Sequence, residues 1–169
     1  KTAYEIPKRD WSSDVCSSDL DSHRAIWNEC VKSDLEMIAV FEDDVVFPSD
    51  FKEVFSKAFS ELPSDWQYWQ FHSSGIRQSN ECEKIGNYIT KLTTHGWGTH
   101  GYLLKKSCAI RLISFNPKTP QKVDTILTLG LISIKMQPYG TVKEKTLCFQ
   151  RGSDTDIKQT SQLGYWKRQ

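Results

Sequence analysis

The chain has 169 residues, of which 25% are charged, and a formal net charge of +1. This length is sufficient for one domain with a hydrophobic core, whereas the nearly neutral charge excludes the basic surface of a nucleic-acid-binding protein. No apolar run approaches the roughly 20 residues that span a bilayer.

Residues 1–20 differ in character from the rest of the chain. They show no hydrophobic period, and residues 10–20 are a cluster of Ser, Asp and Cys. Together with residues 1–5, this cluster resembles the translation of a sequencing-library adapter in a single reading frame. Such scars are left out of fold reasoning. We therefore expect one partial domain over residues 21–169 whose true N-terminus is missing; the alternative is a natural polar loop.

The four cysteines after residue 20 form no CxxC pair and no zinc-ligand spacing. Isolated cysteines of this kind are typical of buried thiols in a reducing compartment. We therefore expect a cytoplasmic protein, with peripheral association at the inner face of a membrane as an option. A signal peptide remains an alternative because the natural start of the chain is expected to be missing.

Hydrophobic spacing predicts the first elements in chain order. Apolar residues at helical spacing after Asp21-Ser22 predict a helix that this pair caps. Residues 37–41 are a continuous apolar run, which predicts a buried strand of the kind found in parallel sheets. Residues 51–62 again have helical spacing, and Pro63 ends that helix.

Shorter apolar segments fill the rest of the chain. They first predict a strand at 66–71 and a loop at 73–87. A glycine-rich loop at 96–101 then leads into a predicted strand at 102–104, which is followed by a helix capped by Ser107. Asp124 opens an apolar segment at 126–132, and further strands are predicted at 134–139 and 146–149. Helices that alternate with short apolar strands are typical of an α/β fold.

Three adjacent carboxylates, Glu42-Asp43-Asp44, directly follow the strand predicted at residues 37–41. Ligands of open α/β sheets bind beyond the carboxyl ends of strands. Adjacent carboxylates repel one another, and a hard divalent cation such as Mg²⁺ or Mn²⁺ balances them with oxygen ligands. Such a metal would offset the charge of a diphosphate leaving group. The alternative is an acidic loop before a helix N-terminus, where negative charge is favoured.

The sequence Ile-Ala-Val-Phe-Glu-Asp-Asp-Val-Val-Phe at residues 38–47 resembles the signature of glycosyltransferase family 25. That family includes lipooligosaccharide and collagen galactosyltransferases. Further blocks that resemble the family, in matching order, are residues 22–27, 98–106, 123–124 and 153–157. The resemblance implies an α/β fold with a GT-A-like, Rossmann-like mixed sheet flanked by helices and lacking its first strand.

The same resemblance implies inverting, metal-dependent transfer of a hexose such as galactose or glucose from a UDP-sugar to a glycan or other hydroxyl acceptor, in lipopolysaccharide or glycan biosynthesis. It makes Asp44 and Glu42 the metal ligands, with Asp43 also at the donor. Family members open with a strand and an arginine-bearing loop that help to hold the nucleotide. Residues 1–20 stand in their place, so we expect this chain to be an inactive piece of an enzyme.

Asp124 is the candidate general base because it is isolated from other charges and falls in a matching block; the alternative is a plain helix N-cap. His23, Trp97 and Tyr102 are candidates for contact with donor or acceptor, since sugar faces stack on aromatic rings and loops carry function. For these three side chains the alternative is a packed core position.

Two other functional classes stay open. A metal-dependent phosphoryl hydrolase also places aspartates after a strand, although Asp44 is followed by Val-Val-Phe and not by the tight Gly- or Thr-bearing loop that such an enzyme needs. The other class is a non-catalytic, glycosyltransferase-like domain that binds carbohydrate.

Overall fold

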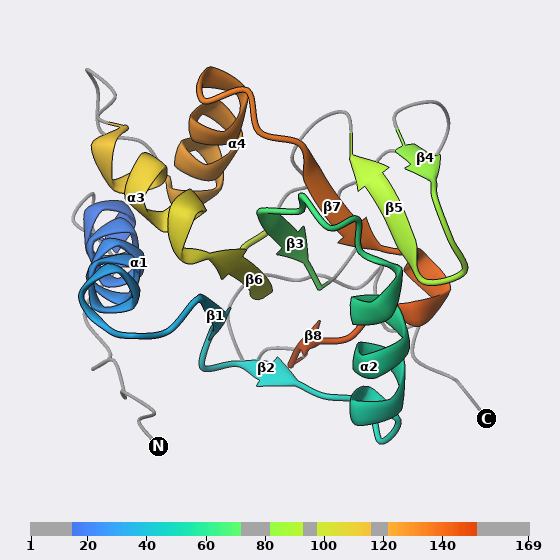
Figure 1. Cartoon of the computed structure of the whole chain (residues 1–169). Helices are drawn as coiled ribbons and strands as arrows, with labels where there is room; N and C mark the ends of the chain where they lie inside the picture. Colours follow the sequence, from blue (N-terminus) through green and yellow to red (C-terminus); the bar gives the residue numbers. More distant parts are fainter. Residues whose placement is uncertain (1–14, 72–81, 93–97, 116–121, 152–169) are drawn as a thin grey trace.

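The computed structural model describes residues 15–71, 82–92, 98–115 and 122–151. In chain order the elements are α1 (Val15–Lys32), β1 (Met37–Phe41), β2 (Val45–Val46), α2 (Phe51–Glu61), β3 (Tyr68–Gln70), β4 (Cys82–Lys84), β5 (Ile89–Leu92), β6 (Gly101–Lys105), α3 (Lys106–Ser114), α4 (Val123–Ser133), β7 (Pro138–Thr141), the 3-10 turn η1 (Lys143–Lys145) and β8 (Phe149–Gln150) (Figure 1).

A six-stranded sheet with the order β1-β6-β3-β7-β5-β4 forms the centre of the molecule. Strands β3 and β7 are parallel, whereas the other four neighbouring pairs are antiparallel. A second, two-stranded sheet pairs β2 with β8. The predicted mixed α/β sheet flanked by helices is confirmed, and it is consistent with a Rossmann-like glycosyltransferase fold.

Helices cover both faces of the large sheet. Helices α1, α3 and α4 lie on one side and α2 lies on the other (Figure 1). Strand β6 shows how the sequence divides between these layers, because successive side chains of a strand point to opposite faces. Tyr102 and Leu104 belong to the core under α1, α3 and α4, whereas Leu103 belongs to the core under α2.

The strand predicted at residues 37–41 is confirmed as β1, but its predicted setting is wrong. β1 lies at one end of the strand order, pairs antiparallel with β6, and buries only Val40 completely. A short apolar run does not distinguish an edge strand from a central one. The helix predicted after Asp21 is also longer than expected. It begins at Val15, so Asp21-Ser22 lies inside it, and Leu20 packs into the core.

The predicted helix at residues 51–62 is confirmed as α2, and the strand at 102–104 lies within β6. The predicted loop at 73–87 is wrong where it contains β4, whose three side chains are exposed and show no apolar pattern. Ser107 is not a cap either, since Lys105 holds the N-cap position of α3 and the Ser107 hydroxyl bonds the Gln67 side chain.

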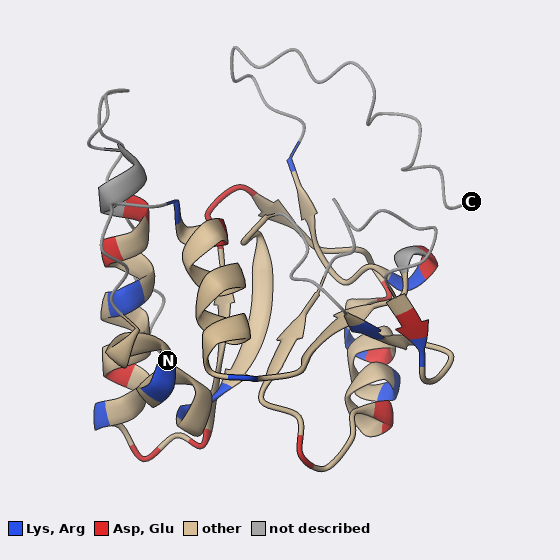
Figure 2. Cartoon of the chain, turned by 90° about the horizontal axis from the view of Figure 1, so that it is seen from above, with Lys and Arg blue, Asp and Glu red and all other residues tan. Residues whose placement is uncertain are grey.

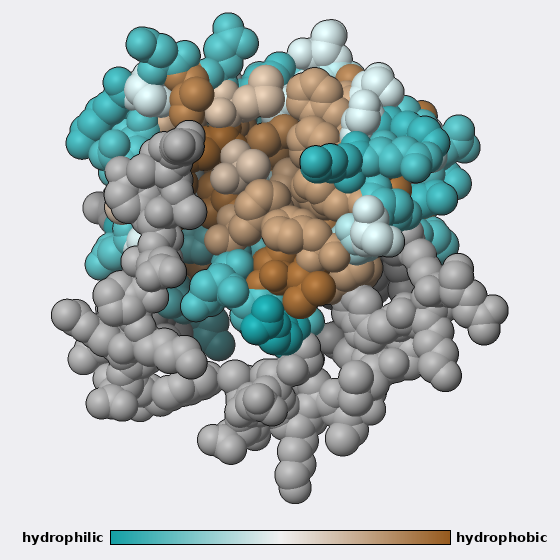
Figure 3. All heavy atoms as spheres, turned by 90° about the horizontal axis from the view of Figure 1, so that it is seen from below, coloured by the Kyte–Doolittle hydropathy of each residue, from teal (hydrophilic) through white to brown (hydrophobic). Residues whose placement is uncertain are grey.

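Polar and apolar side chains are separated on the surface. Lys, Arg, Asp and Glu lie along the outer sides of α1 and α2, and most central strands carry almost none (Figure 2). The underside carries an apolar patch around β2 and the start of α2, where Val46 and Phe47 are 40% and 45% exposed (Figure 3). None of the described helices is long and apolar enough to cross a bilayer.

Candidate active site

The predicted acidic triplet forms the turn that joins β1 to β2. The backbone N–H of Val45 donates to the carbonyl of Glu42 at 3.3 Å, which closes the turn. The Asp43 side chain is exposed, whereas Glu42 and Asp44 are half-buried. The turn therefore directs its carboxylates differently: Glu42 and Asp44 face other parts of the chain and Asp43 faces solvent.

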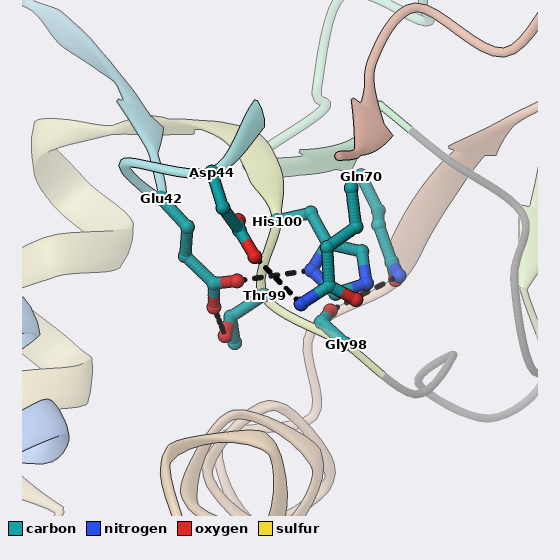
Figure 4. A network of polar contacts seen from close by, with 7 residues as sticks. Glu42, Asp44, Gln70, Gly98, Thr99 and His100 are labelled. Atoms are coloured by element: carbon teal, nitrogen blue, oxygen red, sulfur yellow. Dashed lines mark hydrogen bonds and ion pairs between the residues drawn. The ribbon is translucent and has the colours of Figure 1, made fainter. Parts of the chain in front are cut away.

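Glu42 contacts the segment that leads into β6 (Figure 4). Its Oε1 accepts a hydrogen bond from the Thr99 hydroxyl, and its Oε2 lies 2.9 Å from Nδ1 of His100. Its backbone N–H donates to the carbonyl of His100 at 3.1 Å. Phe41 pairs with Gly101 at the end of the β1–β6 ladder, so Glu42 and His100 are the next cross-strand pair. Opposed residues of antiparallel strands hold their side chains on one face, and this pair carries opposite charges.

The electrostatics of this pair follow from its partial burial. Burial raises the pKa of the Glu42 carboxyl, but hydrogen bonds from His100 and Thr99 and the charge of His100 outweigh it and hold that pKa below its ordinary value. Burial lowers the pKa of His100, but its hydrogen bond to Glu42 and the carboxylates of Glu42, Asp44 and Asp124 raise it overall. Both shifts favour a charged pair.

Asp44 is held by the small second sheet. Its Oδ2 accepts a hydrogen bond from Nε2 of Gln150 at 2.8 Å, and its carbonyl accepts one from the N–H of Arg151 at 2.7 Å. These contacts arise because β8 pairs with β2, directly after the acidic turn. The other carboxylate oxygen, Oδ1, is buried and accepts no hydrogen bond from any described residue. Asp44 thus has an oxygen available for a ligand.

Asp124 lies in the first turn of α4, close enough to the acidic turn to interact with Glu42. Burial, and then the charge of Glu42, raise the pKa of the Asp124 carboxyl; a hydrogen bond from the Gly98 backbone, the charge of His100 and the nearby Thr99 hydroxyl act in the opposite direction. The alternative that Asp124 is a plain N-cap is wrong, since Lys122 holds that position. Asp124 is also the only charged residue within α4.

His23 and Tyr102 lie beside this site in the core. The Tyr102 hydroxyl is 2.7 Å from Nδ1 of His23 and accepts a hydrogen bond from Nε1 of Trp27 at 2.9 Å. Burial lowers the pKa of His23, against the charge of Glu42, so the ring accepts the hydroxyl proton in its neutral form. Both side chains are buried, Tyr102 completely. These are core positions, and their contact with a donor stays a prediction.

Some residues named from the sequence fall elsewhere. Trp97 lies outside the described residues.

Within the described part of the chain, no group of three or more His, Cys, Asp and Glu side chains is arranged to hold a metal ion. A metal at Asp44 would therefore draw on substrate oxygens and water, as Mg²⁺ does when it binds through one or two carboxylates.

The structure adds residues that sequence reasoning missed. Thr99 bonds Glu42, Gln150 bonds Asp44, and Nε2 of Gln70 donates to the carbonyl of Gly98 at 3.4 Å. Gln70 carries a detectable signal, because an amide between Trp69 and Phe71 in a predicted strand needs a buried polar partner. Gln150 carries no such signal, since its position depends on how β8 pairs.

The site extends to a residue within the segment attributed to an adapter. Burial, followed by the charges of Glu42 and Asp124, raises the pKa of Asp19 in α1. Asp19 thus adds a negative charge to a group of carboxylates that already repel one another.

The site is thus an acidic turn at the carboxyl end of an edge strand of a mixed α/β sheet, faced by carboxylates from two helices, Asp124 of α4 and Asp19 of α1, and such carboxylate oxygens are ligands that hard cations prefer. Residues 20–127 match the model of the family described as "Glycosyltransferase family 25 (LPS biosynthesis protein)". The match covers more than half of the chain, and the chain belongs to this family. It includes the acidic turn, Thr99, His100 and Asp124.

Three relatives show the range of the family. The chain is 32% identical over 99 residues to "Probable inactive glycosyltransferase 25 family member 3" of Bos taurus, covering 57% of this chain and 17% of that one. It is 29% identical over 100 residues to "Procollagen galactosyltransferase 2" of Homo sapiens, covering 57% and 16%. It is 27% identical over 135 residues to "Lipooligosaccharide biosynthesis protein lex-1" of Haemophilus influenzae, covering 68% and 42%. The matches span less than half the length of these relatives.

Proposed function

We propose that the protein transfers a hexose from a UDP-sugar to a hydroxyl group of a glycan acceptor, with inversion at the anomeric carbon and with the help of Mn²⁺ or Mg²⁺. The observation that carries the proposal is the acidic turn after β1, where Asp44 presents a buried oxygen that no described residue bonds. Family membership and the names of two relatives, a galactosyltransferase and a lipooligosaccharide biosynthesis protein, support sugar transfer in glycan synthesis.

Asp44 is the residue that fits a divalent cation. Mg²⁺ and Mn²⁺ prefer oxygen ligands, and a buried carboxylate oxygen that no described residue bonds would be stabilised by a bound cation. The hydrogen bond from Gln150 to Oδ2 keeps the other oxygen in a fixed direction. A bound cation would offset the charge of the departing diphosphate.

Asp124 supplies the other requirement of an inverting transfer, a base that takes the proton from the acceptor hydroxyl. The surroundings of Asp124 raise its pKa above that of an ordinary aspartate, and a base works best when its pKa approaches the operating pH. Asp124 lies on α4 and Asp44 in the β1–β2 turn, so the two carboxylates come from different elements. One carboxylate can then act on the acceptor while the other holds the leaving group.

Release of UDP tests this function. The 169-residue chain is incubated with UDP-galactose or UDP-glucose in Mn²⁺, in Mg²⁺ and in EDTA. Release that needs the metal and is lost in Asp44→Asn supports the transferase, whereas no release by this chain is the result expected of an inactive piece of the enzyme. The matched control is Asp34→Asn, which changes an exposed acidic residue outside the site and keeps the rate. Cleavage of p-nitrophenyl phosphate without UDP release would instead favour a phosphoryl hydrolase.

A non-catalytic family 25 domain is the second candidate, and the names of the relatives favour it specifically. Two of the three family 25 member 3 relatives are named as probably inactive and the third as inactive, at 28–32% identity over 99 residues. Sugar or nucleotide binding that is unchanged by EDTA, together with no turnover of either UDP-hexose, would favour this candidate over the transferase.

A further inference from the structure

Two carboxylates of the acidic turn have different surroundings. Both oxygens of Glu42 are engaged, one by the Thr99 hydroxyl and one by the His100 ring, and its N–H continues the β1–β6 ladder. Asp44 keeps one buried oxygen that no described residue bonds. A cation at Glu42 would have to compete with two hydrogen bonds, one of them to a positively charged ring, whereas a cation at Asp44 displaces none at Oδ1.

The segment held by Glu42 in turn holds Asp124. The Gly98 backbone hydrogen-bonds the Asp124 carboxylate, and the Thr99 hydroxyl, whose single proton goes to Glu42, lies beside that carboxylate. The segment is also fastened from β3, because Gln70 bonds the Gly98 carbonyl at 3.4 Å. Gly98 has a φ of 98°, which favours glycine and sets the direction in which the chain enters this segment. Glu42 and Asp124 thus contact the same short segment, residues 98–99, although they belong to different elements.

We propose that Glu42 is a positioning residue and not a metal ligand: it holds Thr99 and His100, and through the segment of residues 98–99 it fixes the carboxylate of Asp124 for the acceptor. This inference rests on the proposed function, and it departs from the role that the family resemblance implies for Glu42. The reason for such a residue is geometric. A general base must lie within hydrogen-bond reach of its proton, and a displacement of about 1 Å can lower the rate about 100-fold.

Metal affinity separates the two carboxylates. Mn²⁺ binding is measured by titration calorimetry, and by electron paramagnetic resonance of free Mn²⁺, for the full chain and for Glu42→Gln and Asp44→Asn. We expect Asp44→Asn to weaken binding at least tenfold, since even outer partners of a metal site are worth about 10- to 100-fold in affinity. The Mn²⁺ affinity of Glu42→Gln should stay within about threefold of the wild-type affinity. Equal losses in both variants would overturn the proposal.

Kinetics test the path through Thr99. Thr99→Val keeps the shape of the side chain but removes the hydroxyl, and Thr99→Ser keeps the hydroxyl. We expect Thr99→Val and Glu42→Ala to lower kcat by about 10- to 100-fold with little change in the KM for UDP-sugar, as expected when only the base is misplaced. Thr99→Ser should recover most of the rate. If Glu42→Ala lowers kcat but Thr99→Val leaves kcat unchanged, Glu42 does not act through Thr99.

Hydrogen–deuterium exchange decides the matter if the chain shows neither Mn²⁺ binding nor turnover. Peptides that cover residues 98–104 are followed in wild type, Glu42→Ala and Asp44→Asn, after thermal melts show that each variant is folded. We expect faster exchange in Glu42→Ala only. Exchange that is unchanged in Glu42→Ala, or equally fast in both variants, overturns the positioning role. Absence of turnover with the expected exchange pattern counts against the proposed function alone.

Discussion

The hydroxyl of Tyr102 lies between Nε1 of Trp27 at 2.9 Å and Nδ1 of His23 at 2.7 Å, in the core where α1 covers β6. An indole N–H can only donate, so the hydroxyl accepts from Trp27 and gives its own proton to His23. One phenolic oxygen thus satisfies two buried ring nitrogens of the helix that precedes the acidic turn.

Tyr102→Phe should therefore destabilise the protein by about 1–3 kcal/mol, because it leaves both buried nitrogens without their partner. The measurement is the free energy of unfolding from urea denaturation. Tyr88→Phe is the matched control, since Tyr88 is only half-buried, and it should change the free energy by less than about 0.5 kcal/mol. Equal effects of the two substitutions would show that the hydroxyl of Tyr102 does not support these two ring nitrogens.

The Glu42–His100 pair makes stability depend on pH. The pKa of Glu42 is lower in the folded protein than its ordinary value of 4.5. The carboxylate therefore stabilises the fold fully above pH 4.5, and this stabilisation is lost as the pH falls through the pKa of the folded state. The pKa of His100 is higher in the folded protein than its ordinary value of 6.5. The imidazolium therefore stabilises the fold fully below pH 6.5, and this stabilisation is lost as the pH rises through the pKa of the folded state. The pair therefore stabilises the fold most between pH 4.5 and 6.5.

We expect the difference in unfolding free energy between wild type and His100→Gln to be largest within that window and to shrink towards pH 9. The measurement is urea denaturation at a series of pH values. Lys57→Met is the control, because it breaks the exposed pair between Lys57 and Glu53 and leaves the site intact. A difference that is constant from pH 5 to pH 9 would contradict a charged His100.

The sequence predicts the main parts of this site but not their contacts. The bounds of β1 follow from its apolar run, and Asp44 follows from its place after that strand. Thr99 and Gln150 could not be identified in this way, because their partners lie 57 and 106 residues away and depend on strand register. Register is set by packing of whole faces, and a shift of one residue would turn Thr99 away from Glu42.

Dependence on tertiary packing also explains where the fold predicted from the sequence was wrong. β4 has three exposed side chains and carries no apolar pattern, so only its pairing with β5 identifies it. Helix α1 includes residues before Asp21 and buries Leu20 in the core, which no local capping signal reveals. Local signals indicated that the elements exist, whereas edges, partners and helix starts depend on tertiary packing.

Asp19 should weaken the folded state at neutral pH. Its raised pKa means that the folded protein disfavours the ionised form, so the penalty is present above the folded pKa and disappears as the pH falls towards 3.8. Asp19→Asn should raise the melting temperature at pH 7–8, by an amount that corresponds to less than about 1 kcal/mol because Asp19 is largely solvated. The gain should vanish near pH 4.

Asp21→Asn is the control for that experiment, since Asp21 is exposed on the same helix. It removes the same unit of charge and should leave the melting temperature nearly unchanged. A melting temperature that rises equally in both variants would indicate a general effect of net charge. It would then give no support for repulsion of Asp19 by Glu42 and Asp124.

Gly101 begins β6 at a point where the core leaves no room for a side chain. A Cβ there would lie 2.5 Å from Sγ of Cys148 and 3.1 and 3.2 Å from ring carbons of Phe41 and Phe71. Gly101→Ala should therefore destabilise the protein by about 1–3 kcal/mol, as overpacking of a core does. Cys148→Ala removes the nearest atom, so adding it should recover part of that loss, and a double-mutant cycle on unfolding free energies measures the coupling. Strictly additive effects would mean that Cys148 is not the atom that limits this position.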